Sequence, residues 1–234
     1  MKIAVVIPAA GKSVRMGAVK QLMILKDMPV LAHTLTVFEN HTEVQEIIVV
    51  GSANLIDEIN SNVIVPYGFS KIKAIVKGGA NRQESVWAGI KAISPDIEGV
   101  LIHDGARPLV SIQAISDVIS YVKQGICAVS GVKSKDTIKI TNSNNIVQDT
   151  PNRAGVWVVQ TPQGFPIYLI KKAHQQAAEE GFLGTDDAML VERMGISVRM
   201  VEGDYCNIKL TTPEDVRVAE ALLIHKLELK NKRL

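Results

Sequence analysis

The sequence is marked by short runs of valine and isoleucine that lack polar alternation. They lie at residues 3–7, 46–50, 73–76, 99–103 and 126–130. Such runs are typical of strands covered on both faces, as in a parallel sheet. Segments with apolar residues at helical spacing lie between them, so strand and helix alternate. We therefore predict a doubly wound α/β fold, in which a mostly parallel sheet carries helices on both faces.

Helical spacing and capping residues place three helix starts. After Ser111, apolar residues recur at helical spacing at positions 112, 115, 119 and 122. Asn81 followed by Glu84 fits a capping box. Thr212 followed by Pro213 and two carboxylates predicts the start of the last helix, because proline is favoured in a first turn.

One polar segment, residues 133–153, interrupts this alternation. Residues 137–140 alternate in polarity, residues 142–145 form a polar turn cluster, and Ile146 with Val147 resumes apolar character. The pattern predicts an inserted β-hairpin. A hairpin this polar is only marginally stable alone. We therefore expect it to lean on another chain, the alternative being a solvated surface hairpin.

The charge balance limits the partners that the chain can bind. Its 234 residues include 26 basic and 24 acidic side chains, a formal net charge of +2. Proteins that grip nucleic acid through its phosphates normally need a large basic excess on one face. The aromatic fraction of 4% also offers few platforms for base stacking. Nucleic acid is therefore not an expected partner.

The cysteines and the N-terminus indicate the setting. Cys127 and Cys206 lie far apart without C-x-x-C spacing, which makes a zinc site or a disulfide framework improbable. The first apolar run is too short for a signal peptide or a membrane span. We expect one domain over residues 1–234, in a reduced, cytoplasmic setting and without contact with a membrane.

The loop after the first apolar run carries the sharpest chemical signal. Small residues at positions 9–11 let backbone N–H groups approach an anion, and Lys12, Arg15 and Lys20 place three cations around the same turn. A triphosphate is the natural ligand for such a loop. The plain alternative is a surface turn with unrelated cations.

Two better-known phosphate loops do not fit this segment. Gly11-Lys12-Ser13 ends like a Walker A motif, but Val6 stands where that motif needs a glycine. The dinucleotide fingerprint G-x-G-x-x-G fails because Ser13 replaces its second glycine. A dinucleotide-dependent oxidoreductase is therefore disfavoured.

Two further stretches follow predicted strands, where an open α/β sheet places its ligand. Residues 78–86, GGANRQESV, bring a double glycine and a helix N-terminus. Residues 103–108, HDGARP, bring Asp104, a candidate partner for Mg²⁺ or ribose, and Arg107, a candidate partner for a phosphate. Alternatively, these two side chains form a turn-stabilising ion pair.

Together these motifs resemble one family along nearly the whole chain. The matching stretches are PAAGKSVRM, Lys20-Gln21, GGANRQESV, HDGARP, Asp136-Thr137, Arg153, Val156-Trp157, QTPQGF, TDDA and VEGDYCNIKLTTPED. The sequence is similar to the cytidylyltransferases that act on 2-C-methyl-D-erythritol 4-phosphate in the non-mevalonate route to isoprenoids. The resemblance implies a Rossmann-like nucleotidyltransferase fold, in which residues 133–154 form a β-hairpin arm that crosses to the partner of a homodimer.

The resemblance also implies a reaction and roles for individual residues. An oxygen of the sugar-alcohol phosphate attacks the α-phosphorus of CTP, pyrophosphate leaves, and Mg²⁺ is bound mainly through the triphosphate, with protein ligands that the sequence does not identify. Arg15 and Lys20 would stabilise the transition state. Arg153, Lys209, Thr137 and Arg107 would bind the sugar phosphate. The nucleotide would be bound by Pro8, Ala9, Ala10, Gly11, Lys12, Gly79, Ser85 and Asp104.

Two alternatives remain open beside this interpretation. Related enzymes transfer CMP to ribitol 5-phosphate and share the first loop. A catalytically silent nucleotide-binding module could also keep the fold, although the joint presence of Arg15, Lys20, Arg153 and Lys209 argues against it.

Overall fold

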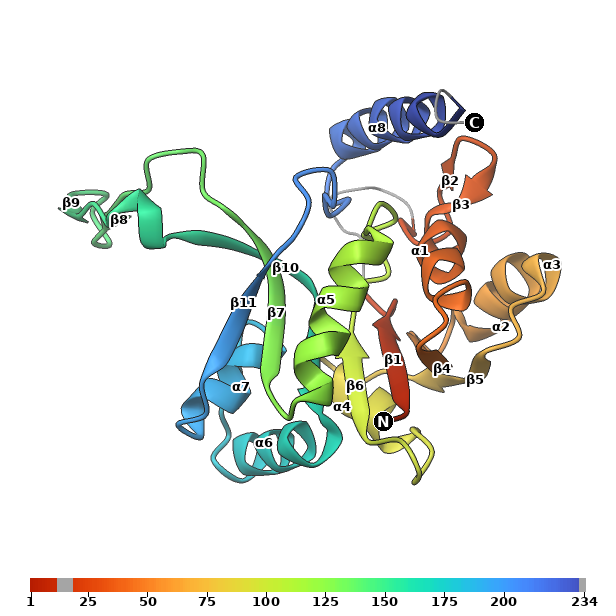
Figure 1. Cartoon of the computed structure of the whole chain (residues 1–234), viewed down its shortest axis with the longest axis horizontal. Coiled ribbons are helices and arrows are strands. Elements are labelled where there is room, and N and C mark those ends of the chain that lie inside the picture. Colours follow the sequence, from red (N-terminus) through yellow and green to blue (C-terminus); the bar gives the residue numbers. More distant parts are fainter. Residues whose placement is uncertain (12–18, 232–234) are drawn as a thin grey trace.

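The computed structural model describes residues 1–11 and 19–231 and is organised around one seven-stranded sheet (Figure 1). Its strands are β1 (Ile3–Pro8), β4 (Val44–Gly51), β5 (Ile72–Lys77), β6 (Gly99–Ile102), β7 (Cys127–Lys133), β10 (Trp157–Pro166) and β11 (Val198–Glu202). Their order is β11-β7-β10-β6-β1-β4-β5. β10 pairs antiparallel with β6 and β7, whereas the other neighbours pair parallel. The five predicted strands and the mostly parallel sheet are confirmed.

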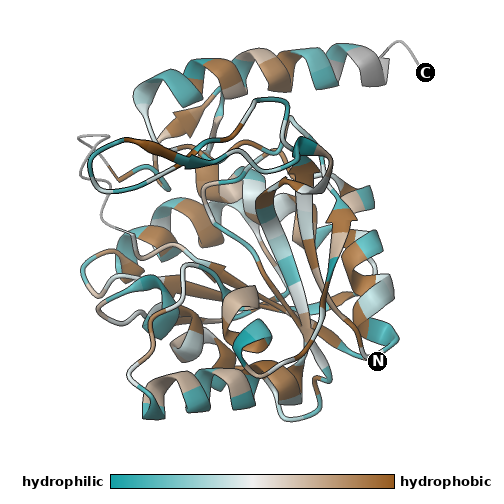
Figure 2. Cartoon of the chain, turned by 90° about the vertical axis from the view of Figure 1, so that its left-hand side faces the viewer, coloured by the Kyte–Doolittle hydropathy of each residue, from teal (hydrophilic) through white to brown (hydrophobic). Residues whose placement is uncertain are grey.

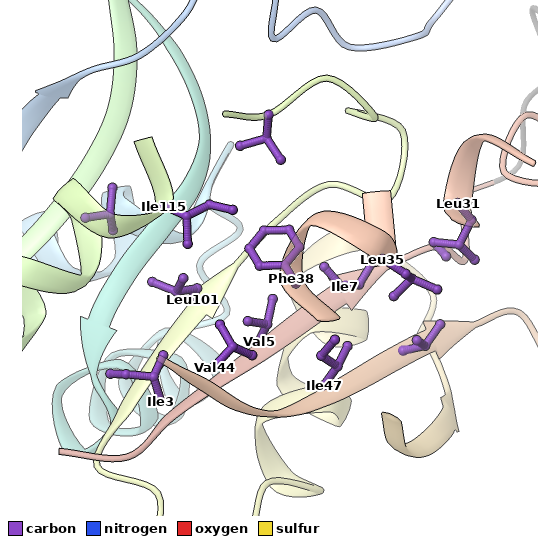
Figure 3. Packing of buried hydrophobic residues seen from close by; sticks show 14 of the residues in the cluster. Ile3, Val5, Ile7, Leu31, Leu35, Phe38, Val44, Ile47, Leu101 and Ile115 are labelled. Atoms are coloured by element: carbon purple, nitrogen blue, oxygen red, sulfur yellow. The ribbon is translucent and has the colours of Figure 1, made fainter. Parts of the chain in front are cut away.

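Helices cover both faces of the sheet. One face carries α1 (Val30–Glu39), α2 (Ile56–Ile59), η2 (Asn60–Ile64), α3 (Val65–Tyr67) and α5 (Ile112–Lys123), and the other carries α4 (Arg82–Lys91), α6 (Ile167–Glu179) and α7 (Asp187–Arg193). Alternate residues of β1 enter the two cores, because successive strand side chains point to opposite faces. Val5 packs with Phe38 and Leu101 on the first face (Figure 3), and Val6 packs with Ile90 on the second.

The predicted helix starts are confirmed by their hydrogen bonds. The side chain of Ser111 accepts the N–H of Ala114 at the start of α5. Asn81 Oδ1 accepts the N–H of Glu84 over 2.9 Å, and Glu84 Oε2 accepts the N–H of Ala80 over 2.8 Å. The first bond satisfies an N–H group that the first turn of α4 leaves without a helical partner, and the second ties the residue before the N-cap to the helix.

The last helix, α8 (Pro213–Asn231), begins at the predicted proline. Asp215 Oδ2 accepts the N–H groups of Thr211 and Thr212 ahead of the helix. α8 alternates apolar and polar residues along its length (Figure 2) and lies over the small hairpin of β2 (Ile24–Leu25) and β3 (Met28–Pro29). Ala219 of α8 packs with Leu25 and Leu210 in a third apolar cluster. This packing ties the C-terminal helix to the end of the sheet that carries the candidate ligand-binding motifs.

The inserted arm is present but differs in detail from its prediction. It projects from the sheet (Figure 1) and contains β8 (Ile140–Thr141), β9 (Val147–Asp149) and the short 3-10 turn η3 (Arg153–Gly155). The sequence pattern predicts a first strand over residues 137–140, but β8 begins only at Ile140, so the prediction is wrong for residues 137–139. Pro151 has no N–H to offer two positions beyond β9, which ends the ladder there.

Two further findings concern the lengths of the helices and the cysteines. In the part of the chain that the structure describes, no helix is both long enough and apolar enough to cross a membrane. Cys127 and Cys206 carry free thiols, and burial raises the pKa of Cys127 to about 11. The Cys127 thiol is therefore a core side chain rather than a reactive one.

Candidate active site

A cavity of about 560 Å³ lies at the carboxyl ends of β1, β5 and β6. This is where ligands bind in open α/β sheets. The residues proposed from the sequence that line it are Pro8, Ala10, Gly11, Lys20, Gly79, Ser85, Asp104 and Lys209. The topology therefore brings residues from the first loop, the double glycine, the HDGARP loop and the segment before α8 to one place.

The remaining proposed residues are placed differently. Ala9 is buried, and its N–H donates to the carbonyl of Val50, so it does not face the cavity. Thr137 and Arg153 lie on the arm, where Arg153 Nη1 donates to the carbonyl of Lys135. Lys12 and Arg15 lie outside the described residues.

One wall of the cavity is a tight backbone cradle at the start of α4. A Cβ added to Gly78 would lie 2.9 Å from the Cβ of Ala10 and 2.7 Å from Ser85 Oγ. Ser85 Oγ accepts the N–H of Gly79 and donates to the carbonyl of Asn81. Because this hydroxyl is engaged locally, it fixes the shape of the cradle. The N-terminus of α4 adds a positive dipole end behind it.

The cavity also contains a carboxylate on which three cations gather. Asp104 Oδ2 lies 2.9 Å from Lys209 Nζ and 3.4 Å from Arg107 Nε, and Asp104 Oδ1 lies 3.6 Å from Arg82 Nε. Burial alone would raise the pKa of Asp104, but the charges of Lys209, Arg82 and Arg107 together outweigh it and hold that pKa well below its usual range. The carboxylate is therefore ionised at any physiological pH.

Arg107 is fixed by a second contact. Its Nη1 donates to the carbonyl of Asn207 over 2.7 Å, while its Nε faces Asp104. The expected ion pair within the HDGARP loop is present, and it forms part of a larger cluster rather than an isolated turn. Arg107 does not line the cavity itself, but it contacts Asp104, which does.

Arg82 is a site residue that the sequence reasoning missed. Its Nη1 lies 2.7 Å from Asp187 Oδ2, so one guanidinium joins Asp104 to a second carboxylate on α7. Both residues sit in motifs that carry the resemblance, GGANRQESV and TDDA. Their place in these motifs marks both residues as candidates for the site. Neither motif alone, however, indicates that Arg82 and Asp187 contact each other.

A buried histidine supports the loop that carries Asp104. His103 is fully buried beside Phe38, with its Nδ1 3.0 Å from Thr161 Oγ1 and its Nε2 3.2 Å from the carbonyl of Arg107. Thr161 Oγ1 also accepts the N–H of Asp104. A neutral imidazole with its proton on Nε2 satisfies both neighbours, since Nδ1 then accepts the hydroxyl proton. Burial lowers the pKa of His103 to about 4.

The donor atoms of the cavity limit how a metal could be held. Among the described residues, Asp104 is the only carboxylate that lines the cavity, and no group of three His, Cys, Asp or Glu side chains could hold a metal ion. Magnesium commonly takes one or two carboxylates and completes its shell with substrate phosphates and water. The residues present therefore fit a Mg²⁺ ion held mainly by a bound triphosphate.

The shifted pKa of His103 predicts a pH-dependent stability. An unfolded chain protonates this histidine near pH 6.5, whereas the folded chain does so only near pH 4. As the pH falls from 7 to 4.5, the unfolded chain gains the proton first, so the folded state loses roughly 2 kcal/mol through this group. Urea unfolding at both pH values should show that His103→Gln loses correspondingly less stability than the parent chain. Equal losses in the two proteins would contradict the assignment.

Comparison with known sequences places the chain in a family. A family model described as 2-C-methyl-D-erythritol 4-phosphate cytidylyltransferase matches residues 3–225. The chain is 47% identical over 225 residues to the protein of that name from Caldanaerobacter subterraneus subsp. tengcongensis, covering 95% of this chain and 99% of that protein. It is also 47% identical over 228 residues to the protein of that name from Halalkalibacterium halodurans, covering 97% and 99%.

Solved structures agree with these sequence relatives. The crystal structure of 4-diphosphocytidyl-2C-methyl-D-erythritol synthase from Anaerococcus prevotii has a TM-score of 0.85 at 34% identity, covering 95% of this chain and 96% of that one. The 2-C-methyl-D-erythritol 4-phosphate cytidylyltransferase from Thermus thermophilus has a TM-score of 0.77 at 32% identity, covering 95% and 98%. The resemblance seen in the sequence motifs is thus confirmed: this chain belongs to the 2-C-methyl-D-erythritol 4-phosphate cytidylyltransferase family.

Proposed function

We propose that the chain transfers CMP from CTP to 2-C-methyl-D-erythritol 4-phosphate, giving 4-diphosphocytidyl-2-C-methyl-D-erythritol and pyrophosphate in isoprenoid precursor synthesis. The observation that carries the proposal is that one cavity holds two different features. They are a close backbone cradle at Gly78 and Gly79 and a cationic cluster around Asp104. The first suits a small base and the second suits phosphates, in a chain that belongs to the matching family.

The chemistry requires charge neutralisation more than proton transfer. An oxygen of the sugar-alcohol phosphate attacks the α-phosphorus of CTP in line, the bond to the β-phosphate oxygen breaks, and pyrophosphate leaves. The attacking phosphate is largely dianionic at pH 7, because its second pKa is about 6, so no general base is needed. Positive charge fixed around the transferring group is then the main contribution to catalysis.

The first loop is proposed to supply that charge. Lys20 lines the cavity, and Lys12 and Arg15 precede it in the sequence. Arg15 and Lys20 are assigned to the transition state, where the phosphoryl group carries spread negative charge, and Lys12 to the triphosphate. Mg²⁺ bound to the triphosphate would add further neutralisation, and Asp104 is the residue of the cavity that would approach it.

The cradle is proposed to bind the nucleoside. Ala10, Gly11 and Gly79 border the cavity with little side-chain bulk, next to Pro8. Because these side chains are small, backbone groups could approach a pyrimidine closely enough to form hydrogen bonds with its amino edge. Ser85 holds the cradle at its closest point, because its hydroxyl is bonded to Gly79 and Asn81.

The sugar phosphate is proposed to lie against Lys209, with Arg107 adding positive charge from its place beside Asp104. Thr137 and Arg153 are proposed to come from the arm of a partner in a homodimer. Three apolar arm side chains are largely exposed in the single chain: Ile140 at 50%, Ile146 at 60% and Val147 at 51%. Apolar side chains gathered on a projecting hairpin favour cover by another protein surface. The supported partner is a second copy of this chain, because two arms could then complete two sites.

The reaction itself can be tested by pyrophosphate release from CTP. We expect release with 2-C-methyl-D-erythritol 4-phosphate and much less with ribitol 5-phosphate, each assayed with Mg²⁺. Purified chain without acceptor provides the background. Release that is faster with ribitol 5-phosphate would favour the related family, and release with neither acceptor would favour a silent nucleotide-binding module.

Lys20→Ala and Arg15→Ala should lower kcat far more than they raise the KM for CTP. The lost charge acts mainly on the transition state, so both kcat and kcat/KM fall, by a factor of about 100 or more. Lys172→Ala, which removes an exposed lysine on α6, is the matched control and should leave both constants unchanged. An unchanged kcat with a raised KM would show that these cations only bind substrate.

Mixed dimers test whether sites are shared between chains. Arg15→Ala and Arg153→Ala subunits should each be nearly inactive, whereas a mixture should regain activity after subunit exchange. In the hybrid, one cavity keeps its own Arg15 and receives the intact Arg153 of the other chain. Exchange can be followed with two differently tagged subunits. Confirmed exchange without recovery would mean that the arm serves its own chain.

A further inference from the structure

Arg82 bridges two carboxylates that come from separate elements. Its Nη1 is 2.7 Å from Asp187 Oδ2, and its Nε is 3.6 Å from Asp104 Oδ1. Asp187 is therefore the closer of its two partners. A planar guanidinium can serve both carboxylates with different nitrogens, which the single ammonium of a lysine does less well. The carboxylates of Asp187 and Asp104 together outweigh burial and raise the pKa of Arg82.

Asp187 is held as a fixed point in the interior. Its exposed fraction is 1%, and its N–H donates to Gln163 Oε1, which also accepts the N–H of Ala188. Its Oδ1 lies 3.7 Å from Nε2 of the buried His174, whose ring stacks on Trp87. With its backbone bonded and its side chain enclosed, Asp187 has little freedom to move toward or away from Arg82.

The fixed position of Asp187 affects the site through the charges around Asp104. Asp104 offers one negative charge to three cations, Arg82, Arg107 and Lys209. Arg82 forms ion pairs with Asp187 and Asp104, so without Asp187 its remaining ion pair would be with Asp104, for which it would compete with Lys209. With Asp187 present, Arg82 stays on the Oδ1 side, and Oδ2 remains available to Lys209 at 2.9 Å.

We infer that Asp187, acting through Arg82, is a positioning residue for CMP transfer, because it keeps the Asp104 carboxylate oriented so that Lys209 is held toward the sugar-phosphate site. Neither Asp187 nor His174 lines the cavity, so both act at a distance from the substrates. The inference rests on the role proposed above for Lys209. It also gives a function to the TDDA motif at residues 185–188, which has no other part in the proposed mechanism.

A purely structural role for the pair is less well supported, because the same loop has another anchor. Gln83 Nε2 donates to the carbonyl of Phe182, and Gln83 Oε1 accepts the N–H of Gly184. These neutral hydrogen bonds fasten the segment before α7 to the start of α4 without touching Asp104. Gln83→Ala is therefore a matched control that loosens the loop and leaves the charge cluster intact.

The test compares KM values with thermal stability. Asp187→Asn keeps the shape of the side chain and removes its charge, and we expect the KM for 2-C-methyl-D-erythritol 4-phosphate to rise about tenfold while the KM for CTP changes less than twofold. Arg82→Lys, which keeps the positive charge but reaches one carboxylate, should show the same pattern if Asp187→Asn folds poorly. Gln83→Ala should lower Tm without the KM change.

The double variant Arg82→Gln with Asp187→Asn separates positioning from structure. It removes both charges of the pair, so Tm should recover relative to Arg82→Gln alone, which leaves the buried Asp187 unpaired. The raised KM should persist, because Asp104 has still lost its support. Recovery of Tm and KM together would overturn the inference and leave the pair with a structural role only.

Lys209→Ala distinguishes a failure of this inference from a failure of the proposed function. If it raises the KM for the sugar phosphate and Asp187→Asn does not, the positioning role of Asp187 is wrong while the role of Lys209 stands. If Lys209→Ala itself leaves that KM unchanged, the proposed sugar-phosphate site is wrong, and the inference falls with it.

Discussion

The carboxylate of Asp104 is the group on which the arrangement of the candidate site depends. It faces Lys209 from the segment before α8, Arg107 from its own loop and Arg82 from the first turn of α4. Cations gathered this closely repel one another, and the negative charge between them offsets that repulsion. These ion pairs also join three chain segments. The contacts of Asp104 therefore determine both the charge and the shape of this part of the cavity.

The fold supplies the rigid frame that such a cluster requires. Parallel strands bring the loops after β1, β5 and β6 to one edge of the sheet, and close core packing on both faces fixes those strand ends. The antiparallel strand β10 adds a support from the other side, because Thr161 bonds both His103 and the backbone of Asp104. The loops that carry the site residues are thus held in place by the packed strands and by hydrogen bonds from β10.

The sequence predicted what depends on local pattern. Apolar runs identify the buried strands, and short-range capping pairs such as Asn81 with Glu84 identify helix starts. It could not predict the contact of Arg82 with Asp187, because that pair forms only when α4 and α7 pack on the same face. Ala9 shows a similar limit. Its small side chain suits a phosphate-binding loop, but its N–H donates to the carbonyl of Val50 at the end of β4 and is not available to a ligand.

The net charge of +2 is nearly neutral, yet three cations gather around Asp104. Because these cations keep its carboxylate ionised, the charge state of Asp104 tests the account most directly. A ¹³C NMR titration of the side-chain carboxyl, assigned by comparison with Asp104→Asn, should find it still ionised at pH 4, where an ordinary aspartate is about half protonated. A midpoint near pH 4 would show that the three cations do not converge on this carboxylate and would contradict the account.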